Sequence, residues 1–513
     1  MTTRTSFMAT ALILLIAVIC YFPTIYGDSA IYFTFLKNFF SLPFAYQPHT
    51  VSYGATSPLF VLLMAPVHAL GGAAWLPIAK AVSIAFMLIG ARLVIRTVAE
   101  SPEEHLASWS LICLNAPLWF ATSAVFETGL VVLALGLCAE AYRRSSLTLL
   151  VIFAGLFHVI RPELIIIGAV IQFAAWRARR YSLRMAMTAA ASYLPVIAYY
   201  AYIFAHTGSL MPSSVAGRAI TALENHAGWM RTSITTYQHL FLQPINIVYA
   251  ILLLSVIVCL VRSEARTKVK SPLALTLVFL LPFLLSPPLD YAARYFLPAT
   301  VLLVPVFLGT LRLVPTERYR TAVVALLAVL GIAMSAAAYP VARRYDMDTL
   351  LLADLPAVLT DSGVADRDTV LMYEVQAQYH LAPHVISADG IVGDGFLPFL
   401  VGKEAFAEAI ARNRITYIVT MNAFSYRPIY KATPLASLYE HDLGAAVGDS
   451  VMLGKVIARK VATNPVFADP ARYMMKAMPE LNIGTAVRVF NATTPAWKGH
   501  HPLWNSVYRV SLR

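Results

Sequence analysis

Long apolar runs recur along the first two-thirds of the chain, and each is roughly twenty residues long, the length that crosses a bilayer core. The first run, 7–26, is too long for the core of a signal peptide, and no small-residue cleavage site follows it. We therefore interpret it as a retained first span. The pattern predicts about eleven membrane-spanning helices, at 7–26, 73–97, 104–122, 124–142, 147–160, 163–177, 185–206, 240–262, 271–288, 294–313 and 319–340.

Two shorter segments separate the first two spans. The segment 57–70 is apolar and bounded by proline or glycine signals. A crossing there would move the basic loop of the next span outside the cell, so we interpret the segment as an interfacial or half-inserted helix. The segment 27–38 opens with Asp28 and closes with Lys37, and it predicts a short helix along the membrane surface. The first outer loop therefore covers 27–72.

Local signals mark two helix ends. Ser101, Pro102 and Glu104 have the spacing of an N-cap, a first-turn proline and a capping-box acid. The pair Arg161-Pro162 joins the short spans 147–160 and 163–177, which predicts a bent or partly re-entrant pair.

The composition changes after Tyr339, where polar residues return and no run is long enough to span a membrane. Period-two and helical patterns predict strands at 368–375, 415–420 and 506–512 and a helix at 403–412. The predicted fold is a polytopic α-helical membrane domain, residues 1–340, followed by an extracytoplasmic α/β domain, residues 341–513.

The composition is that of an integral membrane protein, with 59% hydrophobic and 13% charged residues and a mean hydropathy of +0.67. The formal charge of +12 does not indicate a nucleic-acid partner, because the basic residues cluster in short loops between spans. The four cysteines fall within apolar runs, and they suggest neither a disulfide framework nor metal ligation. No cofactor is indicated, and a divalent metal stays an open alternative.

With about eleven spans and a cytoplasmic N-terminus, the basic loops fall inside and a second set of charged residues falls outside. That set indicates one extracytoplasmic polar site, and it contains Asp28, Lys37, Glu127, Arg161, Glu163, residues 206–218, Asp290 and Arg294.

Asp28 is the candidate general base, and its alternative role is a cap at the end of a span. The cations Lys37, Arg161, Arg218 and Arg294 could grip a phosphate or could instead reach lipid headgroups. Glu127 and Glu163 could position substrate or pair with a cation, and Tyr53 and Thr56 offer hydroxyl groups in the first outer loop. Asp389 and Asp394 precede glycines, as turn residues do.

Six short elements, in order, resemble the GT-C superfamily of membrane glycosyltransferases, within it the branch of bacterial arabinofuranosyltransferases. They are Gly27-Asp28-Ser29-Ala30-Ile31-Tyr32-Phe33-Thr34-Phe35, Tyr53-Gly54-Ala55-Thr56-Ser57-Pro58-Leu59-Phe60, Phe126-Glu127-Thr128-Gly129-Leu130, Ile160-Arg161-Pro162-Glu163, Gly208-Ser209-Leu210-Met211-Pro212-Ser213-Ser214 with Arg218, and Arg294-Tyr295-Phe296-Leu297-Pro298. The chain departs from that branch at Gly27, Thr34 and Ser209, which stand where it usually has an acid, an arginine and an aspartate. The identity of the donor sugar is therefore not inferred from the arabinose enzymes.

The resemblance implies an inverting transferase in the bacterial cytoplasmic membrane, with its active site and C-terminal domain in the periplasm. It implies a sugar donor on a polyprenyl phosphate, a glycan or glycolipid acceptor, and Asp28 as the catalytic base. Two alternatives stay open: a transporter or flippase of lipid-linked sugars, and an inactive relative that binds glycans. A transporter would favour ionisable groups near the bilayer midplane and paired repeats.

Overall fold

The computed structural model describes residues 3–24, 29–47, 50–178, 182–209, 247–262, 297, 300–344, 355–372, 378–379, 381, 383–388, 395–400, 402–421, 434–435, 437–438, 445–467 and 503–513. Its contacts divide the chain into two compact units. We call them the helical unit, Met1–Ile25, Ser57–Tyr199 and Trp229–Arg344, and the sheet unit, Tyr26–Thr56, Tyr200–Gly228 and Tyr345–Arg513. The first outer loop is thus grouped largely with the C-terminal residues, while the predicted division at residue 340 stays a prediction.

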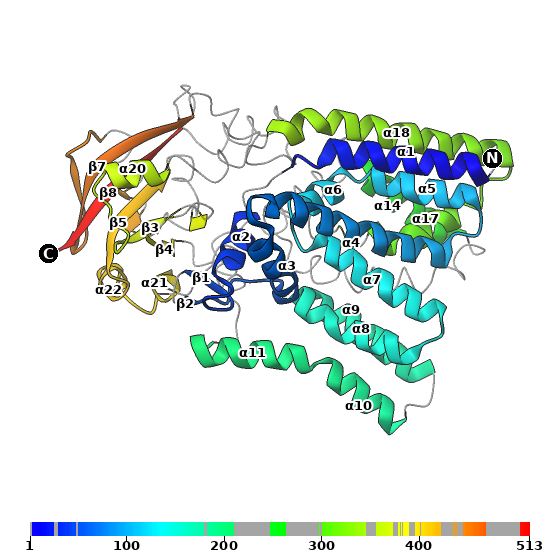
Figure 1. The fold of residues 1–513 in the computed structure, drawn as a ribbon, viewed down its shortest axis with the longest axis horizontal. Helices are drawn as coiled ribbons and strands as arrows, with labels where there is room; N and C mark the ends of the chain where they lie inside the picture. Colours follow the sequence, from blue (N-terminus) through cyan, green and yellow to red (C-terminus); the bar gives the residue numbers. More distant parts are fainter. Residues whose placement is uncertain are drawn as a thin grey trace. The chain divides into compact units, whose positions relative to one another are not determined.

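The helical unit is built from apolar helices, some of them interrupted (Figure 1). They are α1 (Thr3–Tyr21), α3 (Pro58–Gly71), η1 (Gly72–Ala74), α4 (Trp75–Val98), α5 (Pro102–Cys113), α6 (Ala116–Ser123), α7 (Thr128–Arg143), α8 (Leu147–Ile160), η2 (Pro162–Leu164), α9 (Ile165–Ala178), α10 (Leu183–Ser192), α11 (Leu194–Thr207), α14 (Ile247–Val261), α17 (Val304–Leu311) and α18 (Glu317–Arg344). The last residues of α11 belong to the sheet unit.

Four helical stretches among the described residues are long and apolar enough to cross a membrane: Thr3–Tyr21, Pro58–Val98, Leu183–Thr207 and Glu317–Tyr339. The pair α6 and α7 makes a fifth if it is counted as one broken span. The chain is thus mostly helical with several potential spans, as expected of a membrane protein. The full number of about eleven stays a prediction, and the predicted span 271–288 lies outside the described residues.

The predicted span 104–122 is not one helix, because the structure divides it into α5 and α6. Asn115 lies at the break, where its side chain accepts a hydrogen bond from the Leu118 amide at 3.2 Å and donates one to Thr300 at 2.9 Å. An asparagine N-cap followed by Pro117 near the helix start favours a new helix over a continuing one. The N-cap at Ser101 is confirmed, since its hydroxyl accepts from the Glu104 amide.

Helices α4 and α7 pack closely through glycines. A methyl group placed on Gly129 would lie 2.3 Å from the Ser83 carbonyl oxygen, and one on Gly136 would lie 2.4 Å from the Gly90 carbonyl oxygen. Residue numbers therefore rise together along the two helices, which run parallel. Small residues seven positions apart on each helix permit this approach, a common way of packing membrane helices. The parallel course requires α5 and α6 to return the chain, as the alternation of predicted spans also does.

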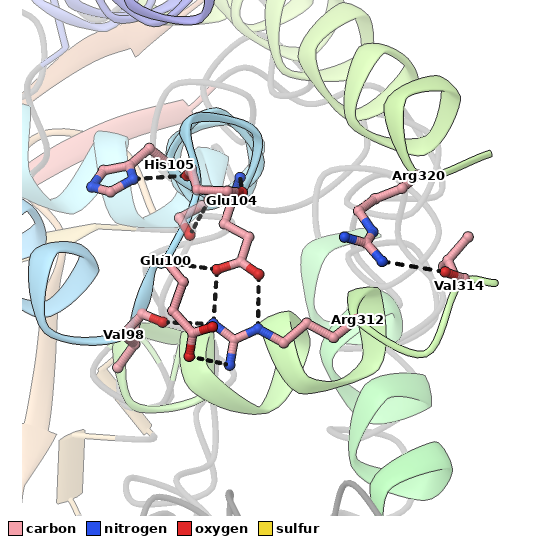
Figure 2. A network of polar contacts seen from close by, with 9 residues as sticks. Val98, Glu100, Glu104, His105, Arg312, Val314 and Arg320 are labelled. Carbon is pink, nitrogen blue, oxygen red and sulfur yellow. Dashed lines mark hydrogen bonds and ion pairs between the residues drawn. The ribbon is translucent and has the colours of Figure 1, made fainter. Parts of the chain in front are cut away.

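A polar network joins α5, α17 and α18 at one end of the helical unit, which we call the Glu104 end (Figure 2). The Arg312 guanidinium binds both carboxylate oxygens of Glu104 at 2.7 Å and also the Val98 carbonyl at 2.9 Å. Glu100 adds a contact of 3.2 Å to Arg312. Thr321, in α18, donates to Glu103 at 3.0 Å. Bidentate pairing of this kind fixes the ends of the helices relative to one another.

The sheet unit contains a six-stranded sheet of order β4-β3-β5-β8-β7-β6 (Figure 1). Its strands are β3 (Thr369–Met372), β4 (His384–Ser387), β5 (Ile415–Met421), β6 (Ser450–Leu453), β7 (Val456–Phe467) and β8 (Leu503–Leu512). Strands β4, β3 and β5 are parallel, and the remaining pairs are antiparallel. Apolar side chains, among them Leu371, Phe396 and Ile418, form a buried core with the short helices α20 (Leu355–Asp361), α21 (Leu397–Leu400) and α22 (Phe406–Arg412).

The predicted strands at 368–375, 415–420 and 506–512 correspond to β3, β5 and β8, and the predicted helix at 403–412 corresponds to α22. The sheet unit also holds α2 (Ser29–Asn38), where the surface helix was predicted, and a small hairpin of β1 (Ala45–Gln47) and β2 (Thr50–Val51) that the sequence did not reveal. Most of α2 is buried. Burial on several sides explains why its apolar residues follow no clean period.

Candidate site at the break between α6 and α7

The helical unit holds a buried ion pair where α6 gives way to α7. The two helix axes differ in direction by 111°, and the break covers residues 124–127. Val125 has φ of 64°, a conformation that a β-branched residue rarely adopts and that costs about 1–3 kcal/mol. Glu127 follows directly, and its carboxylate lies 3.2 Å from the guanidinium of Arg161. Both side chains are almost fully buried.

Arg161 reaches this position because α8 ends next to a proline. Pro162 disfavours helical backbone at the residue before it, and Arg161 is accordingly extended, with φ of −155° and ψ of 134°. Its amide still donates to the Phe157 carbonyl at 2.9 Å, so it forms the last turn of α8. The predicted junction at Arg161-Pro162 is confirmed, and η2 then leads into α9.

Lys80 is a buried cation that sequence analysis missed. Its ammonium group donates to the carbonyls of Phe22 and Thr24 at 2.9 and 2.7 Å, and it lies 5.6 Å from the Phe22 ring centroid. These carbonyls follow the C-terminal end of α1, where helix carbonyls lack partners and carry partial negative charge. A lysine inside the apolar run 73–97 was the available signal, since ionisable residues within spans are rare.

Ser83 connects Lys80 to the helix break. Its hydroxyl lies one helical turn beyond Lys80 on α4 and donates to the Phe126 carbonyl at 3.3 Å. The start of α4, the end of α1 and the α6–α7 break are therefore at the same end of the helical unit. We call this the Lys80 end, and it lies opposite the Glu104 end because α4 runs from one to the other.

In the sheet unit, Lys37 contacts the C-terminal residues. Its ammonium group donates to the Tyr379 carbonyl at 3.0 Å and lies 5.8 Å from that ring centroid. Lys37 keeps contact with solvent, and partial burial lowers the pKa of its ammonium group. Phe33 packs edge-to-face on Tyr379, with ring centroids 5.9 Å apart. The Gln47 amide also donates to the Val385 carbonyl on the edge strand β4. The first outer loop thus packs against the sheet.

Tyr53 and Thr56 have partners inside the sheet unit. The Thr56 hydroxyl forms a hydrogen bond of 3.0 Å with the Tyr32 hydroxyl. Tyr53 is buried, and its ring packs edge-to-face on Tyr200 with centroids 5.7 Å apart. These contacts hold the loop in shape, and the predicted substrate-binding roles of both residues stay predictions.

Several predicted residues lie outside the described part of the chain: Asp28, Arg218, Arg294, Asp389 and Asp394. Glu163 lies in η2, and its side chain also falls outside what the structure describes. Of the predicted site residues that are described, the structure brings together Glu127 and Arg161. Within the described ranges, no group of three or more His, Cys, Asp and Glu residues could hold a metal ion.

No protein-family model, curated protein or solved structure matches this chain. Its function is therefore argued from its own residues. The Lys80 end combines an ion pair, a lysine on helix carbonyls and a strained turn, all buried in apolar helices. Such an arrangement can bind a polar group and exclude water from it.

Proposed function

We propose that the chain is an inverting glycosyltransferase that moves a sugar from a polyprenyl-phosphate donor to a periplasmic cell-envelope glycan or lipid acceptor. The observation that carries the proposal is the buried Glu127–Arg161 pair at the break between α6 and α7. Ionisable groups and non-helical backbone inside a membrane domain mark functional sites, because both are costly there. The six sequence elements that resemble GT-C glycosyltransferases include both members of this pair.

Lys80 supports the proposal through its contact with the segment that leads to Asp28. It binds the carbonyls of Phe22 and Thr24, and Asp28 follows Thr24 by four residues in the chain. We propose that this anchor at Thr24 serves to position Asp28, because a general base must be held within reach of the acceptor hydroxyl.

The proposed reaction is a single displacement at the anomeric carbon. The acceptor hydroxyl oxygen forms the new bond, Asp28 takes its proton, and the bond from the anomeric carbon to the phosphate oxygen breaks. The leaving phosphate gains charge as that bond breaks, so cations near it stabilise the transition state. Lys37, Arg161, Arg218 and Arg294 are the proposed cations, and no nucleotide takes part. The active site faces the periplasm of a bacterial cell.

The test compares the wild-type chain with Asp28→Asn in membranes supplied with polyprenyl-phosphate sugars, a pentose and a hexose in turn. Loss of the base should lower the transfer rate by about 100-fold or more at equal protein level. Asp361→Asn is the control, because Asp361 is an exposed residue at the end of α20. Equal transfer by Asp28→Asn and the wild type would remove Asp28 as the base.

A second candidate function is a transporter of lipid-linked sugars. The broken pair α6 and α7 favours it, because transporters often bind substrate where a membrane helix is interrupted. Reconstituted vesicles distinguish the two. Movement of a fluorescent polyprenyl-phosphate sugar between leaflets, without any transfer to acceptor, would favour the transporter. Binding of glycans without either activity would favour the third reading, an inactive relative.

A further inference from the structure

The turn between α6 and α7 carries two buried hydroxyl groups that form no hydrogen bond within the described structure. They belong to Ser123, the last residue of α6, and Thr128, the first residue of α7. Ser123 has 0% and Thr128 has 3% of its surface exposed. The two residues flank the strained Val125 and the ion-paired Glu127.

Hydroxyl groups buried in protein nearly always have a partner, and one without a partner calls for an explanation. Neighbouring residues show that this part of the fold can supply one. The Thr122 hydroxyl, adjacent to Ser123, donates to the Met87 sulfur at 3.5 Å, and the Ser83 hydroxyl donates to the Phe126 carbonyl. Local packing therefore does not prevent hydrogen bonding at the break.

The first turn of α7 adds further donors. The amides that open a helix have no partner inside it, and they are usually satisfied by a capping side chain. Glu127 occupies the N-cap position but forms no capping hydrogen bond, because its carboxylate pairs with Arg161. The ion pair thus removes the local cap from the first turn of α7.

We propose that the α6–α7 turn binds the sugar ring of the substrate, with Ser123 and Thr128 bonding its hydroxyl groups. Buried hydroxyls that form no hydrogen bond in the described structure, beside the opening amides of a helix, suit the hydroxyl groups of a sugar, which both donate and accept hydrogen bonds. The Glu127–Arg161 pair ties this turn to the end of α8. The inference rests on the proposed function for the identity of the molecule that carries the sugar.

The test measures binding and not turnover, using the full chain in nanodiscs. The probes are a short-chain polyprenyl phosphate carrying glucose, the same lipid carrying arabinose, and the bare lipid phosphate. The wild type should bind at least one sugar-bearing lipid more tightly than the bare lipid. The double variant Ser123→Ala/Thr128→Val should reduce that preference by about ten-fold, since each hydroxyl contributes modestly. Its Kd for the bare lipid should not change.

Ser110→Ala is the matched control. Ser110 is equally buried, but its hydroxyl already donates to the Leu106 carbonyl at 2.8 Å, so its loss should leave the sugar preference intact. The single variant Thr128→Ser leaves Ser123 unchanged and keeps a hydroxyl group at position 128, so it should also retain the sugar preference. It replaces the double variant in the test if the double variant folds poorly.

Two results would overturn the inference. One is equal binding of sugar-bearing and bare lipids by the wild type. The other is a full preference in the double variant, which would leave only water as the partner of these hydroxyls. Failure of the proposed function looks different. If the chain prefers sugar-bearing lipids through Ser123 and Thr128 but never transfers the sugar, the sugar-binding site stands and the proposed transferase activity fails.

Discussion

Glu127 and Arg161 are the residues on which the site depends most directly. Each is buried in a membrane domain, where a lone charge is unfavourable, and each lies where a helix ends. Pairing satisfies both charges, but a buried pair is weak evidence for stability, since desolvation offsets the attraction. The pair is better explained as a device that fixes the turn after Val125. Its contribution can be separated from that of an ordinary surface pair.

We expect Glu127→Gln to lower the free energy of unfolding by about 3–5 kcal/mol, because Arg161 then stays buried without its counter-ion. Glu127→Gln combined with Arg161→Gln should recover part of that loss. The measurement is a double-mutant cycle on unfolding in detergent micelles. The partly exposed pair Glu404 and Arg412, with oxygen and nitrogen 2.6 Å apart, provides the comparison, and Glu404→Gln should cost about 1 kcal/mol or less. Equal costs at the two sites would contradict this account.

At the scale of elements, the close approach of α4 and α7 holds the helical unit together at the site. The glycines at 90, 129 and 136 bring backbone against backbone. Lys80 lies one turn before Ser83 on α4, and Glu127 lies just before α7. The spacing of the two helices therefore decides where the buried cation and the buried carboxylate lie.

Gly136→Ala should destabilise the chain strongly. The added methyl group would meet the Gly90 carbonyl oxygen at 2.4 Å, a backbone atom that cannot move without shifting α4. We expect a loss of about 1–3 kcal/mol or more, seen as a lower midpoint of thermal unfolding. Gly331→Ala in α18 is the control, because its methyl group would lie 3.3 Å from the nearest atom. If Gly136→Ala destabilises the chain less than Gly331→Ala does, α4 and α7 are farther apart than the structure has them.

At the scale of the whole molecule, the polar groups of the helical unit separate into two ends. Glu103, Glu104 and Arg312 meet at one end, and Lys80, Glu127 and Arg161 lie toward the other. The Glu104 end carries basic residues such as Arg96 and Arg143, so the positive-inside rule predicts that it faces the cytoplasm. With an odd number of spans, which stays a prediction, the C-terminal sheet is expected outside.

Single cysteines in a chain without its four natural ones test this arrangement. Ala411→Cys, exposed on α22, should react with a membrane-impermeant maleimide in intact cells. Arg318→Cys, exposed at the start of α18, should react only after the membrane is permeabilised. Reaction of both positions under the same condition would contradict an odd number of spans between the two ends of the chain.

The sequence determined the features that depend on local pattern. Hydrophobic run length predicted α1, α4, α8 and α18 to within a few residues, and the Ser101 and Pro162 signals marked real helix ends. It also predicted β5 and β8, because their alternation is a property of the strands themselves. Asn115 and Pro117 also carry a helix-start signal, but the apolar residues on both sides of them hid the break between α5 and α6.

Only the tertiary structure decided which residues meet. The sequence offered several partners for Glu127. It also placed Lys80 inside an apolar run, but a helical run does not show which carbonyls lie beside the lysine. The pairing of Glu127 with Arg161 follows from the bend at Val125 and the end of α8. The parallel packing of α4 and α7 depends on glycines that fit only when both backbones are in place. Contacts between distant segments depend on three-dimensional packing, which local pattern does not encode.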